Sequence, residues 1–316
     1  MPGATGHDLH IDRFLSEFAI GYRPEGFIAD MIFPTVSVEK QSNVYPIWSR
    51  ADRLRRRKTQ RSPGTYANRI EQTISSDTYF AKNYALSSPV TIEDRLNADA
   101  AIVQGAIEGR TELVLDGLML DWEVRVAHQV TSGSNVGSYS AVSSAWDGSG
   151  DPIGDVNQAI DNVHYSTGVM PNRVVFGVEA WKSFRRDSNV RNLIFGSNNG
   201  GGYPNTSQVA QLLDVDEVMV AGAFENTGEE GLAESLGAIW GDACLVYYAP
   251  TRPTIDRPSL GYSIRWNAPG LPNMQVERHP YNSRTKSEEI EVGYYQDEKL
   301  TATEYGFLLV ACNSST

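Results

Sequence analysis

The sequence predicts an α+β protein, and three patterns along the chain predict it. Apolar residues recur in steps of three and four from Ala98 to Thr131, which is the period of one long helix. Helical and strand-like segments alternate between Trp146 and Pro272, which is typical of a sheet flanked by helices. The tail, 273–316, alternates in steps of two with no helix between its strands, and therefore predicts an antiparallel sheet.

The predicted helix at 98–131 is longer than an ordinary domain requires. At a rise of 1.5 Å per residue it would extend over about 50 Å. Its charged side chains exclude a membrane span, and its apolar heptads are not sustained, which disfavours a coiled coil. Gly105, Gly109 and Gly117 each cost about 1 kcal/mol of helix stability relative to alanine. We therefore expect another segment, or a neighbouring subunit, to pack closely against this spine helix at the three glycines.

The composition is that of a soluble globular protein. The chain has 316 residues, 41% hydrophobic and 21% charged, enough for one large or two ordinary domains. No stretch has the length of a transmembrane helix, and the first ten residues lack the pattern of a secretion signal. Cys244 and Cys312 are the only cysteines, which predicts buried free thiols and excludes a disulfide framework.

The net charge of −12 hides a concentrated basic segment between residues 50 and 69. Eight basic side chains against the single acid Asp52 give this segment a net charge of +7, which leaves −19 on the remainder. A basic loop on an acidic body suits docking on another copy of the body, and equally suits a small nucleic-acid patch. The candidate intersubunit residues are Arg50, Arg53, Arg55, Arg56, Arg57, Lys58, Arg61 and Arg69.

Breaks in pattern divide the chain into four parts. Residues 1–43 are interrupted by glycine and proline and predict an N-terminal arm lying on the surface of another body. Residues 44–88 predict a long β-hairpin, the extended loop, with too few apolar residues to be stable alone. Residues 89–145 and 273–316 form a peripheral domain in which the spine helix covers the strands of the tail. Residues 146–272 form a separate axial α/β domain.

Patterns of catalytic or cofactor chemistry are missing from the sequence. It contains no phosphate-binding loop with its lysine, no dinucleotide fingerprint, no zinc-protease helix and no nucleophile elbow. His128, His164 and His279 have no cysteine or acidic partner at metal or nucleophile spacing, which favours structural histidines. We therefore predict no catalytic residue, no cofactor and no metal, and a structural protein that is not an enzyme.

The axial segment carries motifs that resemble a known family. They are Trp146-Asp-Gly-Ser-Gly-Asp151-Pro152-Ile153, Gly168, Pro171-Asn172-Arg-Val-Val-Phe-Gly177, Trp181, Val190, Leu193, Tyr247 to Pro250, Pro253, Pro258 and Gly261-Tyr262. Together they resemble the axial domain in major capsid proteins of tailed double-stranded DNA bacteriophages. The order of arm, extended loop, spine helix, axial domain and returning tail is similar to the HK97-type capsid fold.

The resemblance implies a self-assembling shell subunit. It implies homo-hexamers and homo-pentamers that close an icosahedral capsid around double-stranded DNA, with the basic loop lying on a neighbouring subunit. It further implies a separate scaffolding protein, a portal, a possible cement protein, non-specific contact with packaged DNA, assembly in the host cytoplasm and no membrane. An encapsulin-type bacterial nanocompartment shell shares the fold and is the alternative. A nucleic-acid-binding protein, or a hydrolase with an unrecognised site, remains open as well.

Overall fold

The computed structural model describes residues 12–48, 54–57, 59–70, 74–96, 100–133, 135–196, 202–228, 231–267 and 273–314. The helices are α1 (Arg13–Gly21), α2 (Ala29–Ile32), α4 (Ile92–Leu96), α5 (Ala100–Thr131), α6 (Pro152–Thr167), α7 (Val178–Arg186), α8 (Ser188–Phe195), α9 (Thr206–Leu213) and a 3-10 turn at Thr303–Tyr305. The strands are β1 (Thr35–Val38), β2 (Ser42–Trp48), β3 (Ile74–Phe80), β4 (Lys82–Thr91), β5 (Tyr139–Ala141), β6 (Arg173–Gly177), β7 (Glu217–Ala221), β8 (Phe224–Asn226), β9 (Leu236–Ala238), β10 (Cys244–Tyr247), β11 (Gly261–Trp266), β12 (Gln275–Asn282), β13 (Ser287–Leu300) and β14 (Gly306–Val310).

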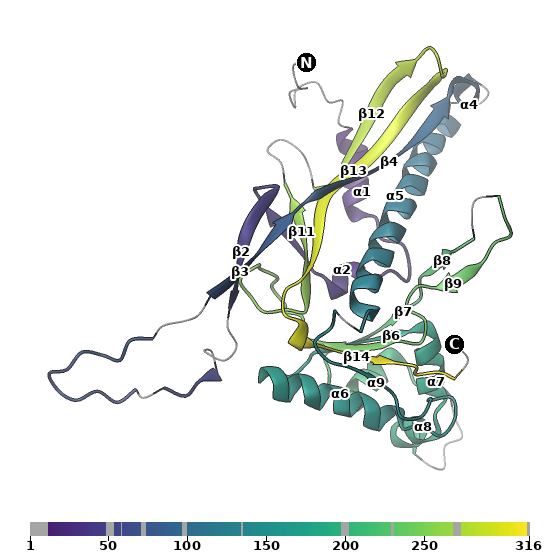
Figure 1. Cartoon of the computed structure of the whole chain (residues 1–316). Helices are drawn as coiled ribbons and strands as arrows, with labels where there is room; N and C mark the ends of the chain where they lie inside the picture. The colour runs from purple at the N-terminus through teal and green to yellow at the C-terminus, as the bar shows by residue number, and fades with distance from the viewer. Residues whose placement is uncertain are drawn as a thin grey trace.

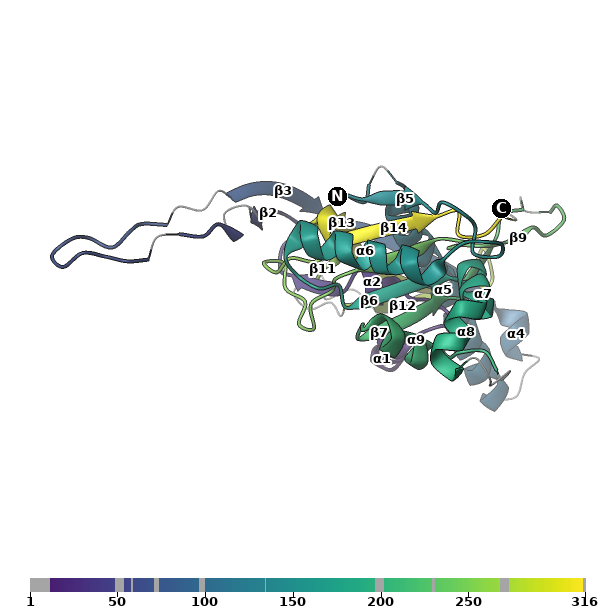
Figure 2. The same ribbon diagram turned by 90° about the horizontal axis from the view of Figure 1, so that it is seen from below.

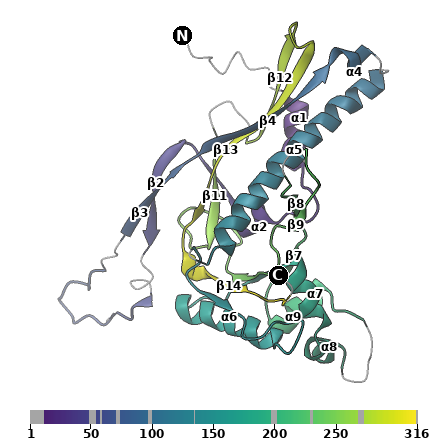
Figure 3. The same cartoon turned by 45° about the vertical axis from the view of Figure 1, so that its right-hand side comes forward.

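The spine helix α5 lies along a long antiparallel ribbon and makes the peripheral core with it (Figures 1 and 3). Strands β1, β11, β13 and β12 are hydrogen-bonded in that order, and β4 pairs with β13 from Thr91 opposite Ser287 to Lys82 opposite Gln296. Leu115 and Val126 of α5 are fully buried in the same apolar cluster as Val292 of β13. The predicted long helix is confirmed, with described bounds at 100–131, and it covers the tail strands as expected.

The arm differs from its prediction. Rather than lying on another body, the described part from residue 12 packs into the core of its own chain. Leu15 of α1 and Ile32 of α2 are buried against the spine, and Phe33 is fully buried. Strand β1 then adds in parallel to β11, from Thr35 opposite Ser263 to Val38 opposite Trp266. The apolar side chains of this segment are buried between α5 and β11. The broken helical patterns in the sequence did not reveal this packing.

The axial domain is a sheet in the order β5-β14-β10-β6-β7, with α6 to α9 around it (Figure 2). Helix α6 begins and ends at residues that favour helix termini. Asp151 accepts a hydrogen bond from the Gly154 amide at 3.1 Å, Pro152 is the first helical residue, and Gly168 ends the helix in the left-handed conformation. Helix α9 begins at a capping box, in which Asn205 and Gln208 exchange side-chain-to-backbone hydrogen bonds.

The two sheets exchange strands, which the predicted domain bounds did not include. Strand β14 belongs to the tail but lies between β5 and β10 of the axial sheet. Strand β11 belongs to the 146–272 segment but pairs with β13 in the peripheral sheet. The first four residues of β14 are buried, and only the middle of a sheet covered on both faces provides that environment.

The extended loop projects from the body (Figures 1 and 2). Its base is the two-stranded ribbon of β2 and β3, which pair antiparallel from Ser42 opposite Phe80 to Trp48 opposite Ile74. Beyond the base, residues 54–57 and 59–70 extend outward with no strand pairing. The described part of the chain holds no helix with the length and apolarity to span a bilayer.

Candidate assembly surfaces and the junction at Glu123

The extended loop exposes both basic and apolar side chains. Tyr66 is 98% exposed, Ile70 69% and Leu54 58%, although Leu54 also touches Gly168 at the end of α6. A segment with so little internal packing gains little stability from its own contacts.

Most of the loop's basic side chains that the structure describes form no ion pair within their own subunit. Arg55, Arg56, Arg61 and Arg69 have no ion pair with any described residue, whereas Arg57 does interact within the chain. Arg50, Arg53 and Lys58 lie outside the described residues. At least four of the candidate intersubunit cations are therefore available to a neighbour.

The three spine glycines differ in their surroundings. A methyl group added at Gly117 would lie 3.0 Å from Cδ1 of Leu86, so β4 of the same chain makes the close approach there. A methyl group at Gly109 would meet nothing within 4 Å, so this face of the helix is open in the isolated subunit. The surroundings of Gly105 lie outside what the structure describes. Close packing by a neighbour at Gly109 stays a prediction.

A buried carboxylate that we did not predict joins three parts of the chain. Glu123 of α5 is fully buried and accepts hydrogen bonds from the Ile28 amide at 2.9 Å and the Ala29 amide at 2.8 Å. Its other oxygen accepts from Nε1 of Trp240 at 2.7 Å. Burial raises the pKa of Glu123, and the three hydrogen bonds oppose that rise. Glu123 thus fastens the arm and the turn before β10 to the spine.

A second polar network, also unpredicted, joins the spine to β13. Arg125 forms an ion pair with Glu298 at 2.9 Å and lies 3.8 Å from the ring centre of Tyr84. Glu298 in turn accepts from Gln296 at 2.8 Å, and Gln296 accepts from Nε of Arg265 at 3.0 Å. The sequence did hold a signal for both networks, because Glu123, Gln296 and Glu298 fall on the otherwise apolar faces of their elements.

Catalytic or metal chemistry finds no geometric support in the described residues. They contain no group of three or more His, Cys, Asp or Glu side chains placed to hold a metal. Cys244 and Cys312 are buried free thiols, as predicted, and burial raises the pKa of both. His279 contacts Glu291 at 2.8 Å on the peripheral sheet, in a structural pairing.

Comparison with known proteins shows which proteins the chain is similar to. No family model matches the chain. Two curated relatives do, both named major capsid protein. That of Burkholderia phage BcepMu is 23% identical, covering 84% of this chain and 87% of its own length. That of Pseudomonas phage JBD67 is 24% identical, covering 94% and 95%. This chain is similar to phage major capsid proteins over most of its length. The resemblance stated from the sequence is thereby confirmed, and the structural character of these relatives agrees with the prediction of a protein that is not an enzyme.

Several solved structures share the fold. A phage-related protein from Bordetella bronchiseptica is similar with a TM-score of 0.75 and 23% identity, covering 97% of this chain and 98% of that one. The capsid structure of cyanophage P-SCSP1u gives 0.58 at 10% identity, covering 93% and 90%. A virus-like particle from Pyrococcus furiosus gives 0.53 at 12% identity, covering 93% and 95%. The predicted α+β HK97-type capsid fold is confirmed.

Proposed function

We propose that this chain is the structural subunit of an icosahedral viral capsid that encloses double-stranded DNA. The single observation that carries the proposal is similarity over nearly the whole chain to two phage major capsid proteins. The subunits would form homo-hexamers and homo-pentamers, and the protein would reside in the virion. The fold agrees with this role, and so does a projecting loop that exposes Tyr66 and Ile70.

The four predicted parts receive roles within this proposal. Residues 44–88 are the extended loop, 146–272 supply most of the axial domain, and 89–145 and 273–316 supply most of the peripheral domain with the spine helix. Strands β11 and β14 are exchanged between the two domains. The N-terminal arm, 1–43, is fastened to the spine through Glu123. The basic side chains of the loop make ion pairs on the acidic body of a neighbouring subunit, since 50–69 carries +7 and the remainder −19.

The proposal extends to other components of the particle. A separate scaffolding protein directs assembly in the host cytoplasm, a portal occupies one vertex, and a cement protein is a possible addition. Packaged DNA is contacted non-specifically, as expected for an interior surface facing a mixed sequence. These partners rest on the resemblance to tailed-phage capsid proteins.

Charge reversal in the loop tests the proposal. Replacing Arg55, Arg56 and Arg57 together by glutamate should abolish or strongly reduce particle formation, since each attraction to an acidic neighbour becomes a repulsion. The matched control replaces the same three residues by lysine, which keeps the charge and should still assemble. Particles are counted by negative-stain microscopy, and circular dichroism with urea unfolding checks the fold of the subunit. Normal particle yield from the glutamate variant at physiological salt would refute the assigned role of the loop.

The contents of purified particles distinguish the capsid from the alternative. An encapsulin-type shell shares the fold. The observation that supports this alternative is the structural similarity to the Pyrococcus furiosus virus-like particle. Particles that contain an enzyme and no nucleic acid would contradict the proposal of a viral capsid. A nucleic-acid-binding protein would instead show DNA affinity in the unassembled subunit, falling steeply as salt rises.

A further inference from the structure

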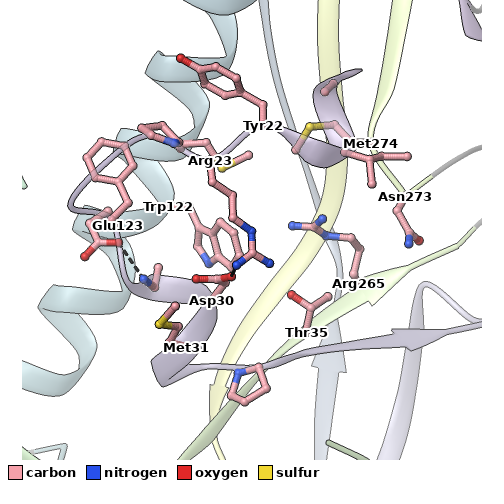
Figure 4. Close-up of a pocket in the computed structure, with 17 residues that line it drawn as sticks. Tyr22, Arg23, Asp30, Met31, Thr35, Trp122, Glu123, Arg265, Asn273 and Met274 are labelled. Atoms are coloured by element: carbon pink, nitrogen blue, oxygen red, sulfur yellow. Dashed lines mark hydrogen bonds and ion pairs between the residues drawn. The ribbon is translucent and has the colours of Figure 1, made fainter. Parts of the chain in front are cut away.

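The cavity beside Glu123 contains charged groups that are already paired. It has a volume of about 460 Å³ and lies between the arm, the spine helix and β11 (Figure 4). Asp30 forms an ion pair with Arg23 at 2.8 Å, and Glu123 accepts from the amides of Ile28 and Ala29. The carboxylates of this lining have partners within the chain, so the cavity gives no reason to expect a ligand.

The hairpin formed by β8 and β9 has an apolar face that its own subunit leaves open. Cross-strand partners lie on the same face of a sheet, and so do residues two positions apart along a strand. Phe224 lies opposite Ala238, and Leu236 lies opposite Asn226. Phe224 and Leu236 therefore share one face. Phe224 is 49% exposed, Leu236 70%, and Leu232 of the connecting turn 69%, which together indicate a contact surface.

Hydrogen bonds within the hairpin hold the turn end in shape. Oδ1 of Asn226 accepts from the amide of Gly228 at 3.0 Å and from that of Ser235 at 2.9 Å. The amide of Thr227 donates to the carbonyl oxygen of Ser235 at 2.9 Å. The exposed side chains are thus presented on a ribbon that is already formed, so a partner loses little conformational entropy in ordering it.

The same hairpin is acidic and holds no cation. Residues 224–238 contain Glu225, Glu229, Glu230 and Glu234 and no basic residue, which gives a net charge of −4. Glu225 and Glu234 form no ion pair with any residue that the structure describes. Glu229 and Glu230 lie outside the described residues. At least two carboxylates of the hairpin are therefore open to cations of a partner.

The extended loop complements the hairpin in both charge and apolar character. Its segment 50–69 carries a net charge of +7, and Leu54, Tyr66 and Ile70 are exposed along the loop. Complementary charges on two surfaces steer their encounter and fix the register in which they meet. Burial of apolar side chains on both sides adds the favourable free energy that exposed ion pairs supply only weakly.

The loop and the hairpin lie on opposite flanks of the subunit (Figures 1 and 2). The loop therefore points away from the hairpin of its own chain and toward a neighbour. A contact between two different surfaces of identical subunits is head-to-tail, and it repeats into a closed ring when the rotation between subunits closes. Each subunit of such a ring would donate one loop and receive one.

We propose that the β8–β9 hairpin is the surface on which the extended loop of a neighbouring subunit docks. Glu225 and Glu234 accept hydrogen bonds from arginines of that loop, and Phe224 and Leu236 pack against its exposed apolar side chains. This inference rests on the proposed role of the loop in shell assembly, and it names the surface that receives the loop.

Charge reversal in the hairpin tests the contact in the full-length protein. Glu225→Arg combined with Glu234→Arg should lower particle yield in negative-stain counts at least about tenfold, because like charges then face each other. The matched control, Asp161→Arg combined with Asp216→Arg, changes the net charge equally at exposed acids outside the hairpin and should assemble normally. Normal yield from the hairpin variant, or an equal loss from the control, would overturn the proposal.

Photocrosslinking locates the docking surface directly. Tyr66→benzoylphenylalanine places a reactive ring on the loop, and this variant is co-assembled with isotope-labelled wild-type subunits. Mass spectrometry of the irradiated particles should find it joined to residues 224–238 of a labelled subunit. The matched control carries the same substitution at Tyr165, which is exposed on α6, and should capture no residue of that segment.

The outcomes separate this inference from the proposed function. Capture of the loop at the spine helix, or no capture within 224–238, would overturn the hairpin as docking surface while the capsid role stands. Normal particle yield after charge reversal in the loop itself would contradict the role of the loop in assembly, and would overturn this inference with it.

Discussion

Replacing Glu123 by glutamine should destabilise the subunit, although the two side chains have nearly the same shape. The carboxylate accepts from three donors: the amides of Ile28 and Ala29 on one oxygen, and the indole of Trp240 on the other. The glutamine oxygen can serve the two amides, but its NH₂ group then faces the indole N–H. The indole N–H and the NH₂ group are both left without an acceptor, and each unmatched buried group costs about 1–3 kcal/mol. Glu123→Ala would leave all three donors unmatched, so its loss should be at least about 3 kcal/mol.

A double-mutant cycle with Trp240→Phe isolates the indole bond. Phenylalanine removes the N–H and some volume from both backgrounds equally, so the difference between the two backgrounds measures the coupling. We expect Trp240→Phe to cost about 1–2 kcal/mol less in the Glu123→Gln background than in the wild type. Urea unfolding of the purified protein, at one fixed concentration and with the assembly state checked by gel filtration, gives the four free energies. A coupling energy near zero would refute the assigned role of Glu123.

The pH dependence of the same pair of proteins checks the electrostatics. Burial raises the pKa of Glu123 in the folded state above its unfolded value of about 4.3. The folded protein therefore holds this proton more tightly, and the resulting stability is complete below the unfolded pKa and lost as pH rises through the folded pKa. Glutamine does not titrate, so the stability advantage of the wild type over Glu123→Gln should shrink as pH rises above about 4.3. An advantage that grows with pH would mean that the hydrogen bonds, and not burial, set the pKa.

Three further predictions follow from local geometry. Gly109→Ala should stabilise the subunit by about 1 kcal/mol in urea unfolding, because the added methyl group meets no atom within 4 Å. A fall in shell yield from this variant would reveal a neighbour packed on that face. Gly117→Ala is the matched control, and its gain in stability should be smaller because its methyl group would lie 3.0 Å from Leu86. Gly177→Ala should cost about 1–3 kcal/mol, because its methyl group would collide with the carbonyl oxygen of Gly241, and an unchanged melting temperature would contradict the packing. Cys244 and Cys312 should resist iodoacetamide in the native protein and react rapidly in urea, because burial raises their pKa values; rapid labelling of the native protein would contradict their burial.

The parts of the fold that follow from local pattern could be predicted from the sequence. The spine helix is predicted by apolar spacing over residues 98–131, and the structure has it at 100–131. The ends of α6 also carry local signals, an Asp-Pro start and a glycine end. The strand exchange between the two sheets was not visible, because β11 and β14 pair with strands distant in sequence and local patterning does not record such partners. The burial of α1 and α2 was missed for the same reason, since short amphipathic segments do not show what they pack against.

The candidate sites likewise include one that the sequence predicts and one that it does not. A run of arginines is evident as charge, and the structure shows that this run belongs to a projecting segment. Glu123 and the cavity beside it could not be predicted, because the partners of Glu123 are 94, 95 and 117 residues away. A lone carboxylate on an apolar helix face indicates that buried donors exist, yet it does not say which segments supply them.

The distribution of contacts within the subunit indicates where assembly adds the most order. Buried carboxylate, guanidinium and apolar contacts join the arm, the spine and the axial domain. The core of this body is therefore formed within one subunit. In the part of the loop beyond β2 and β3 that the structure describes, Tyr66, Leu54 and Ile70 are exposed, and their contact with water costs free energy. Contact with a neighbour would cover those side chains and pair the arginines in one step. The loop would lose conformational entropy only when it docks on a neighbour. Shell formation should therefore depend more steeply on salt and on loop substitutions than the folding of the subunit does.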